Sequence, residues 1–351
     1  MIPAFGAREL LYRCLESVER ELARAGLYDA SEIIVADDAT PAGLGAELPE
    51  RHPRVRCLVA RRRRGFAVNA NRGVGAARGG VVCLLNTDMV VLPGFFDACL
   101  AAFEDRSLFA VTGRILEPSG VNAGCKSLVL DGARVVVAES HAGDPCSLRE
   151  GPSPYANGGG SFFRRSAFLK LGGFDRAFSP FYWEDTDLGY RAWKRGYWIL
   201  YDPVRAAAHD HQGTIGRLRE RVVRRAYQRN RRRFVWHNNT SVGLGSLFRE
   251  TNLRPMLHAL LRLRVRGVTR LLAEARFLPR AAAARRSTRR CQVIGDADLA
   301  GLWPDPLDAP RSHRVESRLA GASTVRGEGT GQPAASAPAR AGDWSTDRRP
   351  L

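Results

Sequence analysis

Lysine is nearly absent from this chain of 351 residues: only Lys126, Lys170 and Lys194 occur, against 51 arginines. A bias of this size is typical of coding composition, so arginine content alone indicates no function. The position of the charge is more informative, because residues 217–290 hold 21 arginines and three acids and account for the formal net charge of +18. We therefore expect a near-neutral globular part followed by a basic extension, which argues against a uniformly basic nucleic-acid-binding protein.

The chain also lacks long hydrophobic runs and paired cysteines. No apolar stretch approaches the roughly 20 residues of a membrane-spanning helix, and the first residues do not have the basic and apolar parts of a secretion signal. Seven scattered cysteines without a Cys-x-x-Cys pair favour reduced, mostly buried thiols over zinc sites or disulfides. We therefore expect a cytoplasmic protein. Hydrophobic residues make up 44% of the chain, which suffices for a core.

Short apolar runs alternate with helical patterns in the first hundred residues. This alternation is typical of an α/β fold, with a mostly parallel sheet flanked by helices. The opening residues 1–3 resemble the end of a strand, from which we expect the natural start to lie upstream. Strands are expected at 32–38, 55–59, 81–85 and 198–201, and helices at 7–25, 69–78 and 93–103.

Composition divides the chain into three expected parts. Residues 1–216 form the α/β domain, residues 217–290 a basic helical extension, and residues 291–351 a disordered tail with few large apolar side chains. Between residues 257 and 272, leucine and valine fall at helical spacing with arginines between them. Such a helix lies on an anionic membrane surface or packs on the domain with a solvated basic face. Both interpretations stay open, and we favour membrane contact.

Acidic residues occur where the predicted strands end. Asp37 and Asp38 follow one strand, Asp88 follows another, and a third acidic cluster spans residues 184–187. A single aspartate in such a place more often caps a turn. Ligands of open α/β sheets bind at the carboxyl ends of strands, however, so three clusters separated by glycine-rich loops favour a binding site.

Seven short motifs follow one another along the chain, and each alone is weak. They are Ile33–Asp38, Gly65–Gly73, Leu84–Asp88, Asn157–Ser161, Gly172–Asp175, Glu184–Arg191 and His209. In this order they resemble family-two glycosyltransferases of the GT-A fold, and the resemblance covers roughly residues 1–240. It implies a Rossmann-like α/β domain that transfers a sugar from a nucleoside diphosphate.

The resemblance implies a donor site for a UDP-, dTDP- or GDP-linked sugar along the strand ends. Asp37 accepts a hydrogen bond from the base, Pro3 and Phe5 lie beside the base, and Asp38 caps the following turn. Glycine in the later loop lets the backbone approach the sugar closely. The remaining donor residues implied by the motifs are Asn71, Asn86, Asp88, Gly159 and Gly160.

The segment Asn86-Thr87-Asp88 resembles an Asn-x-Asp variant of the family's metal motif. Asp88 is then a metal ligand, and His209 matches the position that completes the site, with His211 as the alternative. Oxygen ligands suit magnesium or manganese, and a histidine nitrogen leans towards manganese. In isolation, these residues would more often have structural roles.

The pair Glu184-Asp185 matches the family's acidic pair at the start of a helix. One of the two removes the proton from the acceptor hydroxyl, and we assign this base to Asp185, with Glu184 second. Asp187 is expected near the helix N-terminus, where the dipole stabilises a carboxylate. The neighbouring Tyr182 and Trp183 either stack on a sugar or belong to the core.

The sequence thus predicts a metal-assisted, inverting glycosyltransferase of cell-wall or polysaccharide biosynthesis. Its acceptor is a hydroxyl of a lipid-linked compound or glycan, and its place is the inner face of the membrane, without nucleic-acid partners. The alternative is a catalytically inactive, membrane-associated binding protein on the same scaffold. The truncated opening strand and Asn86 in place of an acid favour this alternative. A nucleotidyltransferase is less favoured, because it would not need Glu184-Asp185 and His209.

Overall fold

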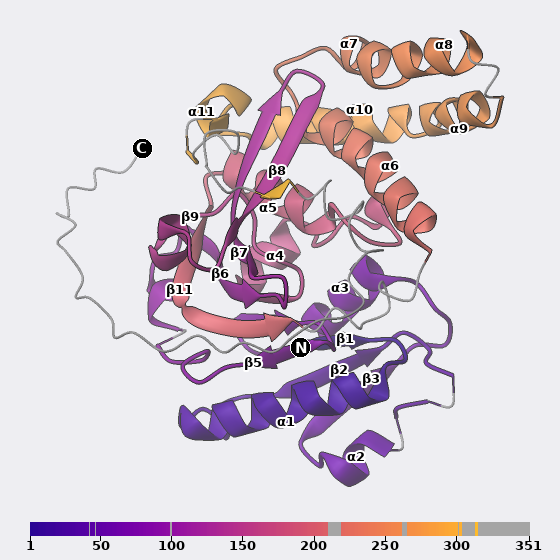
Figure 1. The fold of residues 1–351 in the computed structure, drawn as a ribbon. Coiled ribbons are helices and arrows are strands. Elements are labelled where there is room, and N and C mark those ends of the chain that lie inside the picture. Colours follow the sequence, from indigo (N-terminus) through magenta and orange to yellow (C-terminus); the bar gives the residue numbers. More distant parts are fainter. Residues whose placement is uncertain are drawn as a thin grey trace, which may run out of the picture.

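The first three strands form a parallel sheet, in the order β1-β2-β3 (Figure 1). The computed structural model of the chain describes residues 1–41, 43–45, 47–98, 100–209, 219–261, 265–300, 302–303 and 313–314. The Met1 amino group donates to the Cys83 carbonyl, and the Leu85 N–H donates to the Met1 carbonyl. These two hydrogen bonds join this sheet to the next one. The strands here are β1 (Ile2–Ala4), β2 (Ile33–Asp37), β3 (Val55–Val59) and β4 (Val81–Leu85).

Helices cover both faces of β2, because its successive side chains point to opposite sides. Ile34 belongs to the same hydrophobic cluster as α3, whereas Ile33 and Val35 belong to the cluster of α1. The helix and strands expected at 7–25, 32–38, 55–59 and 81–85 are therefore confirmed within a few residues. The helices are α1 (Arg8–Arg24), α2 (Glu47–Arg51) and α3 (Phe66–Ala76).

The second sheet is mixed, which differs from the mostly parallel sheet expected from the sequence. Its central strand β6 runs parallel to β11 but antiparallel to β7 and β10. Hairpin connections allow antiparallel pairing without a crossover helix. The main strands are β6 (Leu108–Leu116), β7 (Val121–Asp131), β8 (Arg134–His141), β10 (Gly160–Arg164) and β11 (Trp198–His209).

Strand β7 turns directly into β8, a hairpin that the sequence analysis missed. Asp131 pairs with Arg134, and Gly132 in the two-residue turn has a φ of +53°. An Asp-Gly pair between apolar runs is a hairpin signal that could have revealed it.

The helix expected at 93–103 is wrong for the described residues of that range. The chain makes turns there, followed by a short 3-10 helix, η1 (Ala101–Glu104). Gly94 has a φ of +90° and Ala98 a φ of 47°. The Gly94 N–H donates to Glu21 Oε1 of α1 at 2.7 Å, which holds these turns against α1.

The helices after residue 219 share the core of the strands. Phe234, Val235 and Trp236 of α6 are fully buried in the same cluster as Ile34 and Phe163. The expected boundary at residue 216 therefore does not separate two cores. The helices are α4 (Arg165–Lys170), α5 (Glu184–Lys194), α6 (Glu220–Asn238), α7 (Leu244–Phe248), α8 (Arg254–Leu261), α9 (Val265–Ala275), α10 (Leu278–Cys291) and α11 (Asp296–Ala300).

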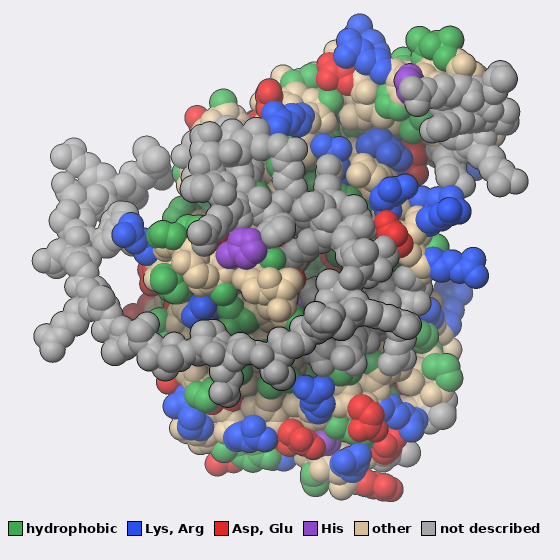
Figure 2. Space-filling model, in the orientation of Figure 1, with side chains coloured by type: hydrophobic (Ala, Val, Ile, Leu, Met, Phe, Trp, Pro, Cys, Tyr) green, Lys and Arg blue, Asp and Glu red, His purple; other side chains and the backbone are tan. Residues whose placement is uncertain are grey.

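Several arginines of this region donate to backbone carbonyls rather than face solvent. Arg231 donates to the Val135 carbonyl at 2.8 Å. Arg285 is 4% exposed and donates to the carbonyls of Asn239 and Val242. The exposed arginines of α6 lie in its first half, where Figure 2 shows Lys and Arg side chains along one edge.

Helices α7, α8 and α9 extend away from the sheets (Figure 1). Leu253, Leu257, Leu260 and Leu261 lie at helical spacing and are 41%, 59%, 49% and 77% exposed. We call these four residues the leucine face. None of the helices among the described residues has the length and apolar character needed to cross a bilayer.

Residues 292–300 and 302–303, expected within the disordered tail, include residues that contact the core instead. Asp296 is buried and forms an ion pair of 2.6 Å with Lys194. Trp303 packs on Trp193 and donates its indole N–H to the Leu128 carbonyl. The rest of the expected tail lies outside the described residues, except for 313–314.

The Lys194 ammonium offers a test of this C-terminal attachment. Its three donors reach Asp296, the Asn238 carbonyl at 2.6 Å and the Thr240 hydroxyl at 2.7 Å. We expect Lys194→Ala to lower the free energy of unfolding by about 3–5 kcal/mol, because it leaves a buried carboxylate uncompensated. Urea denaturation measures this loss. The exposed Lys170→Ala serves as the control and should change little; equal losses in both variants would contradict the buried ion pair.

Candidate active site

Asp88 and His209 meet at one end of the second sheet. Strand β5 (Met89–Val91) pairs antiparallel with the end of β11, with His209 opposite Met89. His209 Nε2 lies 3.4 Å from Asp88 Oδ1, and both side chains are largely buried. Among the described residues no third His, Cys, Asp or Glu joins them in a cluster. His211, the alternative ligand, lies outside the described residues.

The glycine-rich loop at 157–160 packs directly against Asn86. A Cβ atom on Gly159 would lie 2.2 Å from Asn86 Nδ2, so a side chain there would force the Asn86 amide to move. The Asn86 N–H also donates to the Gly159 carbonyl at 3.1 Å. Gly160 begins β10, where a Cβ atom would contact Ile115 at 2.9 Å. The structure thus brings together Asn86, Gly159 and Gly160 as the sequence predicts for the donor site.

The Asp185 carboxylate lies on the other side of the same loop. Its Oδ2 accepts the Gly158 N–H at 3.3 Å, and its Oδ1 accepts the Thr186 N–H at 2.7 Å. Asp185 keeps partial exposure in the first turn of α5. A carboxylate that is held in place yet partly open has the geometry of a general base.

Glu184 has a different environment from its neighbour. It is 7% exposed, and its Oε2 has no hydrogen-bond partner among the described residues. Burial, and then the charge of Asp185, raise the pKa of Glu184 well above its usual range. Glu184 therefore holds its proton near neutral pH, which makes Asp185 the better of the two candidate bases.

Asp187 lies in the first turn of α5, as expected, and also joins α5 to α6. Its carboxylate bonds to Arg191 at 2.8 Å, to Asn238 Nδ2 at 2.8 Å and to His237 Nδ1 at 3.4 Å. Burial alone would raise the pKa of Asp187, but the charge of Arg191 and these hydrogen bonds lower it well below its usual range. Asp187 is thus a buried structural anion.

The two aromatic residues before the acidic pair separate in the structure. Trp183 is 3% exposed and packs between Tyr227 and Phe234, with ring centroids at 5.3 and 5.2 Å. Of the two interpretations left open, the core applies to Trp183. Tyr182 stays half-buried, with its ring edge on Tyr227.

The adjacent aspartates at the end of β2 have distinct partners. Asp37 Oδ1 accepts the Thr40 N–H at 3.0 Å, whereas its buried Oδ2 has no partner among the described residues. Asp38 accepts the backbone N–H groups of Arg64 and Gly65, both at 2.8 Å. Asp37, not Asp38, therefore caps the following turn, and Asp38 holds the loop before α3.

Arginine stacks on the ring that the sequence places beside the base. The Arg63 guanidinium lies 3.8 Å from the centroid of the half-buried Phe5 ring. Pro3 is buried in β1 opposite Ala36. Sequence reasoning missed Arg63, although the exposed arginine run at 61–64 was a signal for it.

Asn71 uses both ends of its amide within the protein. It donates to the Phe174 carbonyl at 2.8 Å and accepts the Phe174 N–H at 2.9 Å. This arrangement locks α3 to the loop before α5. The donor contact expected for Asn71 stays a prediction beside this structural role.

Lys126 is a further residue near the base that the sequence analysis did not identify. It is 7% exposed, and its Nζ lies 4.1 Å from the centroid of the Tyr155 ring. Burial lowers the pKa of Lys126 to about 8, although the charges of Asp185 and Glu139 raise it. Lys126 thus places a buried amine near the acidic pair.

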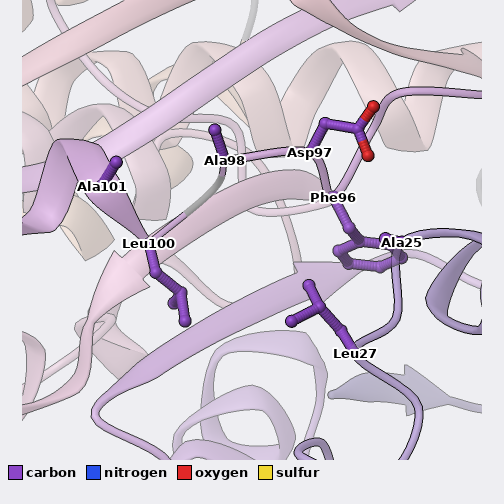
Figure 3. A pocket seen from close by; sticks show the side chains of 7 residues that line it. All are labelled: Ala25, Leu27, Phe96, Asp97, Ala98, Leu100 and Ala101. Atoms are coloured by element: carbon purple, nitrogen blue, oxygen red, sulfur yellow. The ribbon is translucent and has the colours of Figure 1, made fainter.

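A separate surface hollow lies away from these residues. It is lined by the end of α1 and by the turns after Pro93, including Leu27, Phe96 and Leu100 (Figure 3). Its charged residue, Asp97, is paired with Arg24. The hollow contains none of the predicted site residues and does not resemble a catalytic centre.

Known proteins resemble the part of the chain that holds this site. The sequence profile of Glycosyl transferase family 2 matches residues 1–172. The N-acetylglucosaminyl-diphospho-decaprenol L-rhamnosyltransferase of Mycobacterium tuberculosis is 27% identical over 210 residues, which cover 53% of this chain and 68% of that protein. The Pre-mycofactocin glycosyltransferase of the same organism is 27% identical over 203 residues, which cover 56% of this chain and 40% of that protein.

Solved structures show the same fold. A crystal structure of GalNAc-T7 with UDP, GalNAc and Mn²⁺ superimposes with a TM-score of 0.54 at 20% identity, over 67% of this chain and 47% of that one. The chain thus spans about two thirds of the rhamnosyltransferase and less than half of the other two proteins. Residues 1–172 therefore belong to glycosyl transferase family 2, and the chain is a glycosyltransferase with the GT-A fold.

Proposed function

We propose that the chain is an inverting glycosyltransferase that moves a sugar from a nucleoside diphosphate to an acceptor hydroxyl, with Asp185 as the base. One observation carries this proposal. The loop at 157–160 contacts Asn86 at Gly159 and Asp185 at Gly158, so the metal motif and the base both contact a single loop. A donor diphosphate near Asp88 and an acceptor hydroxyl near Asp185 would then meet across the glycines.

The nucleotide base would bind at the end of β2. The unpartnered Oδ2 of Asp37 is ready to accept an N–H of a uracil, thymine or guanine ring. The stacked Phe5 and Arg63 would flank that ring, and the arginine adds positive charge near the phosphates.

A divalent metal fits the donor set of Asp88 and His209. One carboxylate oxygen and one imidazole nitrogen, 3.4 Å apart and largely buried, suit manganese or magnesium. Mn²⁺ accompanies UDP in the GalNAc-T7 structure. When bound, the metal would offset the negative charge of the leaving diphosphate.

Asp185 would remove the acceptor proton while the hydroxyl oxygen attacks the anomeric carbon. The Gly158 and Thr186 N–H groups hold the carboxylate in place. Attack occurs opposite the leaving diphosphate, so a single displacement inverts the anomeric centre. The neutral Glu184 takes no part in this proton transfer.

The acceptor class follows from the relatives. One relative is named for a diphospho-decaprenol substrate. Another, the Succinoglycan biosynthesis protein ExoO of Rhizobium meliloti, is 37% identical over 97 residues, which cover 26% of each chain. We infer a lipid-linked or polysaccharide acceptor, in cell-wall or polysaccharide synthesis. The leucine face, with the exposed Arg249 and Arg254 beside it, would then lie on the anionic inner face of the membrane.

Replacing the base tests the catalytic assignment. We expect Asp185→Asn to lower turnover by about 10²–10⁴-fold while donor binding stays intact. Glu184→Gln, which mimics the neutral acid, should keep most of the turnover. Release of nucleoside diphosphate from UDP-, dTDP- and GDP-sugars measures both rates. Equal losses in the two variants would contradict the assignment, and no release with any donor would favour an inactive binding protein.

The metal site is tested by nucleotide binding. Titration calorimetry with UDP, GDP and dTDP should show tighter binding to the wild type when Mn²⁺ is added. We expect Asp88→Ala and His209→Ala to remove this dependence on Mn²⁺, because each loses one ligand. Asp97→Ala, an acid outside the site, is the control. Unchanged metal dependence in Asp88→Ala would exclude it as a ligand.

Membrane contact is tested with vesicles. We expect the protein to bind vesicles that contain phosphatidylglycerol at low salt, and to bind phosphatidylcholine weakly. Leu257→Asn with Leu261→Asn should weaken binding at least about tenfold, since burying one leucine contributes about 1.5–3 kcal/mol. Val204→Asn, at another exposed apolar residue, is the matched control. Equal binding by all three proteins would contradict this role of the leucine face.

A further inference from the structure

Two cysteines that are distant in the sequence meet beside the β7–β8 hairpin. The Ser140 hydroxyl lies 3.4 Å from Cys125 Sγ and 3.1 Å from Cys146 Sγ. Both thiols thus contact the same hydroxyl group. Cys146 is exposed to solvent, whereas Cys125 is half-buried. Together they form an accessible thiol with a second thiol directly behind it.

An irregularity in the hairpin places Cys125 there. Asn122 pairs with Ser140 and Lys126 pairs with Glu139, so the residues 123–125 bulge out of the ladder. Bulges re-aim side chains that a regular strand would hold on one face. Cys125 is thereby free to face the segment after β8.

The segment that carries Cys146 is held to the same bulge. In η2 (Pro145–Leu148), the buried Ser147 donates its hydroxyl to the His141 carbonyl at 2.6 Å. The Ser147 carbonyl accepts the Tyr201 hydroxyl at 2.8 Å, and Asn122 Nδ2 donates to that hydroxyl at 2.7 Å. This chain of hydrogen bonds connects the two cysteine-bearing segments, so the pair is preorganised.

The pair divides into a nucleophile and a resolving thiol. The neighbouring Cys125 thiol, and then Ser140, lower the pKa of Cys146 to about 6, although burial acts in the opposite direction. The same contact and burial raise the pKa of Cys125 far above its usual range. Near neutral pH, Cys146 is therefore a thiolate, the reactive form of cysteine, and Cys125 keeps its proton.

We propose that Cys125 and Cys146 form a redox-active dithiol site that takes low-molecular-weight disulfides as oxidants. The Cys146 thiolate attacks one sulfur of the oxidant, forming a mixed disulfide and releasing one thiolate. Cys125 then loses its proton and attacks Cys146 Sγ, which forms the Cys125–Cys146 bond and releases the second thiolate. The protein dithiol is oxidised by two electrons, and the small disulfide is reduced to two thiols.

The bulge also connects this pair to the transfer site. Its Ala123 carbonyl accepts both Lys126 Nζ at 3.2 Å and Asn157 Nδ2 at 3.1 Å. Asn157 precedes Gly158, whose N–H reaches Asp185. Closing the disulfide draws Cys125 towards η2, so we propose that it displaces these contacts and slows sugar transfer. This coupling rests on the proposed function, whereas the dithiol itself does not.

Mass mapping tests the dithiol without an activity assay. The reduced full chain is incubated with oxidised glutathione at neutral pH, quenched with acid and mapped as peptides. We expect a reversible bond between Cys125 and Cys146 in the wild type, and glutathione trapped on Cys146 in Cys125→Ser. In Cys146→Ser, Cys125 should react at least about tenfold more slowly than Cys146 does in the wild type, because the thiolate fraction falls tenfold for each unit of pKa.

Cys291→Ser is the matched control, since it removes another exposed thiol and leaves the pair intact. It should form the same bond as the wild type. Glutathione that persists on Cys146 in the wild type, or an unmodified Cys146, would overturn the dithiol proposal.

The coupling is tested by transfer rates of the same samples. Oxidation should lower the wild-type rate several-fold, dithiothreitol should restore it, and the double variant Cys125→Ser with Cys146→Ser should not respond to either reagent. An equal rate in the oxidised and reduced wild type would overturn the coupling alone. If no donor sugar is transferred, the proposed function fails while the peptide maps still decide the dithiol.

Discussion

The close approach of the loop at 157–160 to strand β4 is the constraint on which the transfer site depends. Gly159 lies so near to Asn86 that no side chain fits between them. The backbone that is held there offers the Gly158 N–H to Asp185. A residue with a side chain at Gly159 would push the loop away from Asn86 and separate the two halves of the site. Pairing of β11 with β5 then places His209 beside Asp88 at the same end of the sheet.

Charge has several separate roles in this molecule. The active-site end of the sheets holds aspartates, whereas the helices after residue 219 hold arginines that donate to backbone carbonyls. Part of the +18 is therefore a set of planar, multidentate hydrogen-bond donors that close the C-terminal helices onto the core. Two of the three lysines are buried. The ammonium of Lys194 is compact, and its three donors satisfy groups that converge on one point. Lys194 joins α5 to Asp296 in this way, and Lys126 lies beside the proposed base.

Local patterns predicted much of the first half of the fold and the elements of the site. The apolar spacing of α1, the short apolar run of β2 and the acids that follow it depend on neighbours within a few residues. The partners of Asp37, Asp38 and Asp187 were not predictable in this way. Asp38 bonds to a loop far along the chain, and Asp187 bonds to residues of α6. The same limit explains why the cysteines, which share no short motif, were expected to be unrelated thiols.

The sequence by itself determined the family, the α/β class and the residue types available for chemistry, because motif order and hydrophobic periodicity are local properties of the chain. Only the tertiary structure decided which carboxylate of the acidic pair is open to solvent, since Glu184 is buried with a raised pKa whereas Asp185 stays partly exposed. It also decided that α6, at the start of the basic region, packs into the core, and that Cys125 meets Cys146. These outcomes depend on desolvation and on contacts between distant segments, and both exist only once the chain has folded.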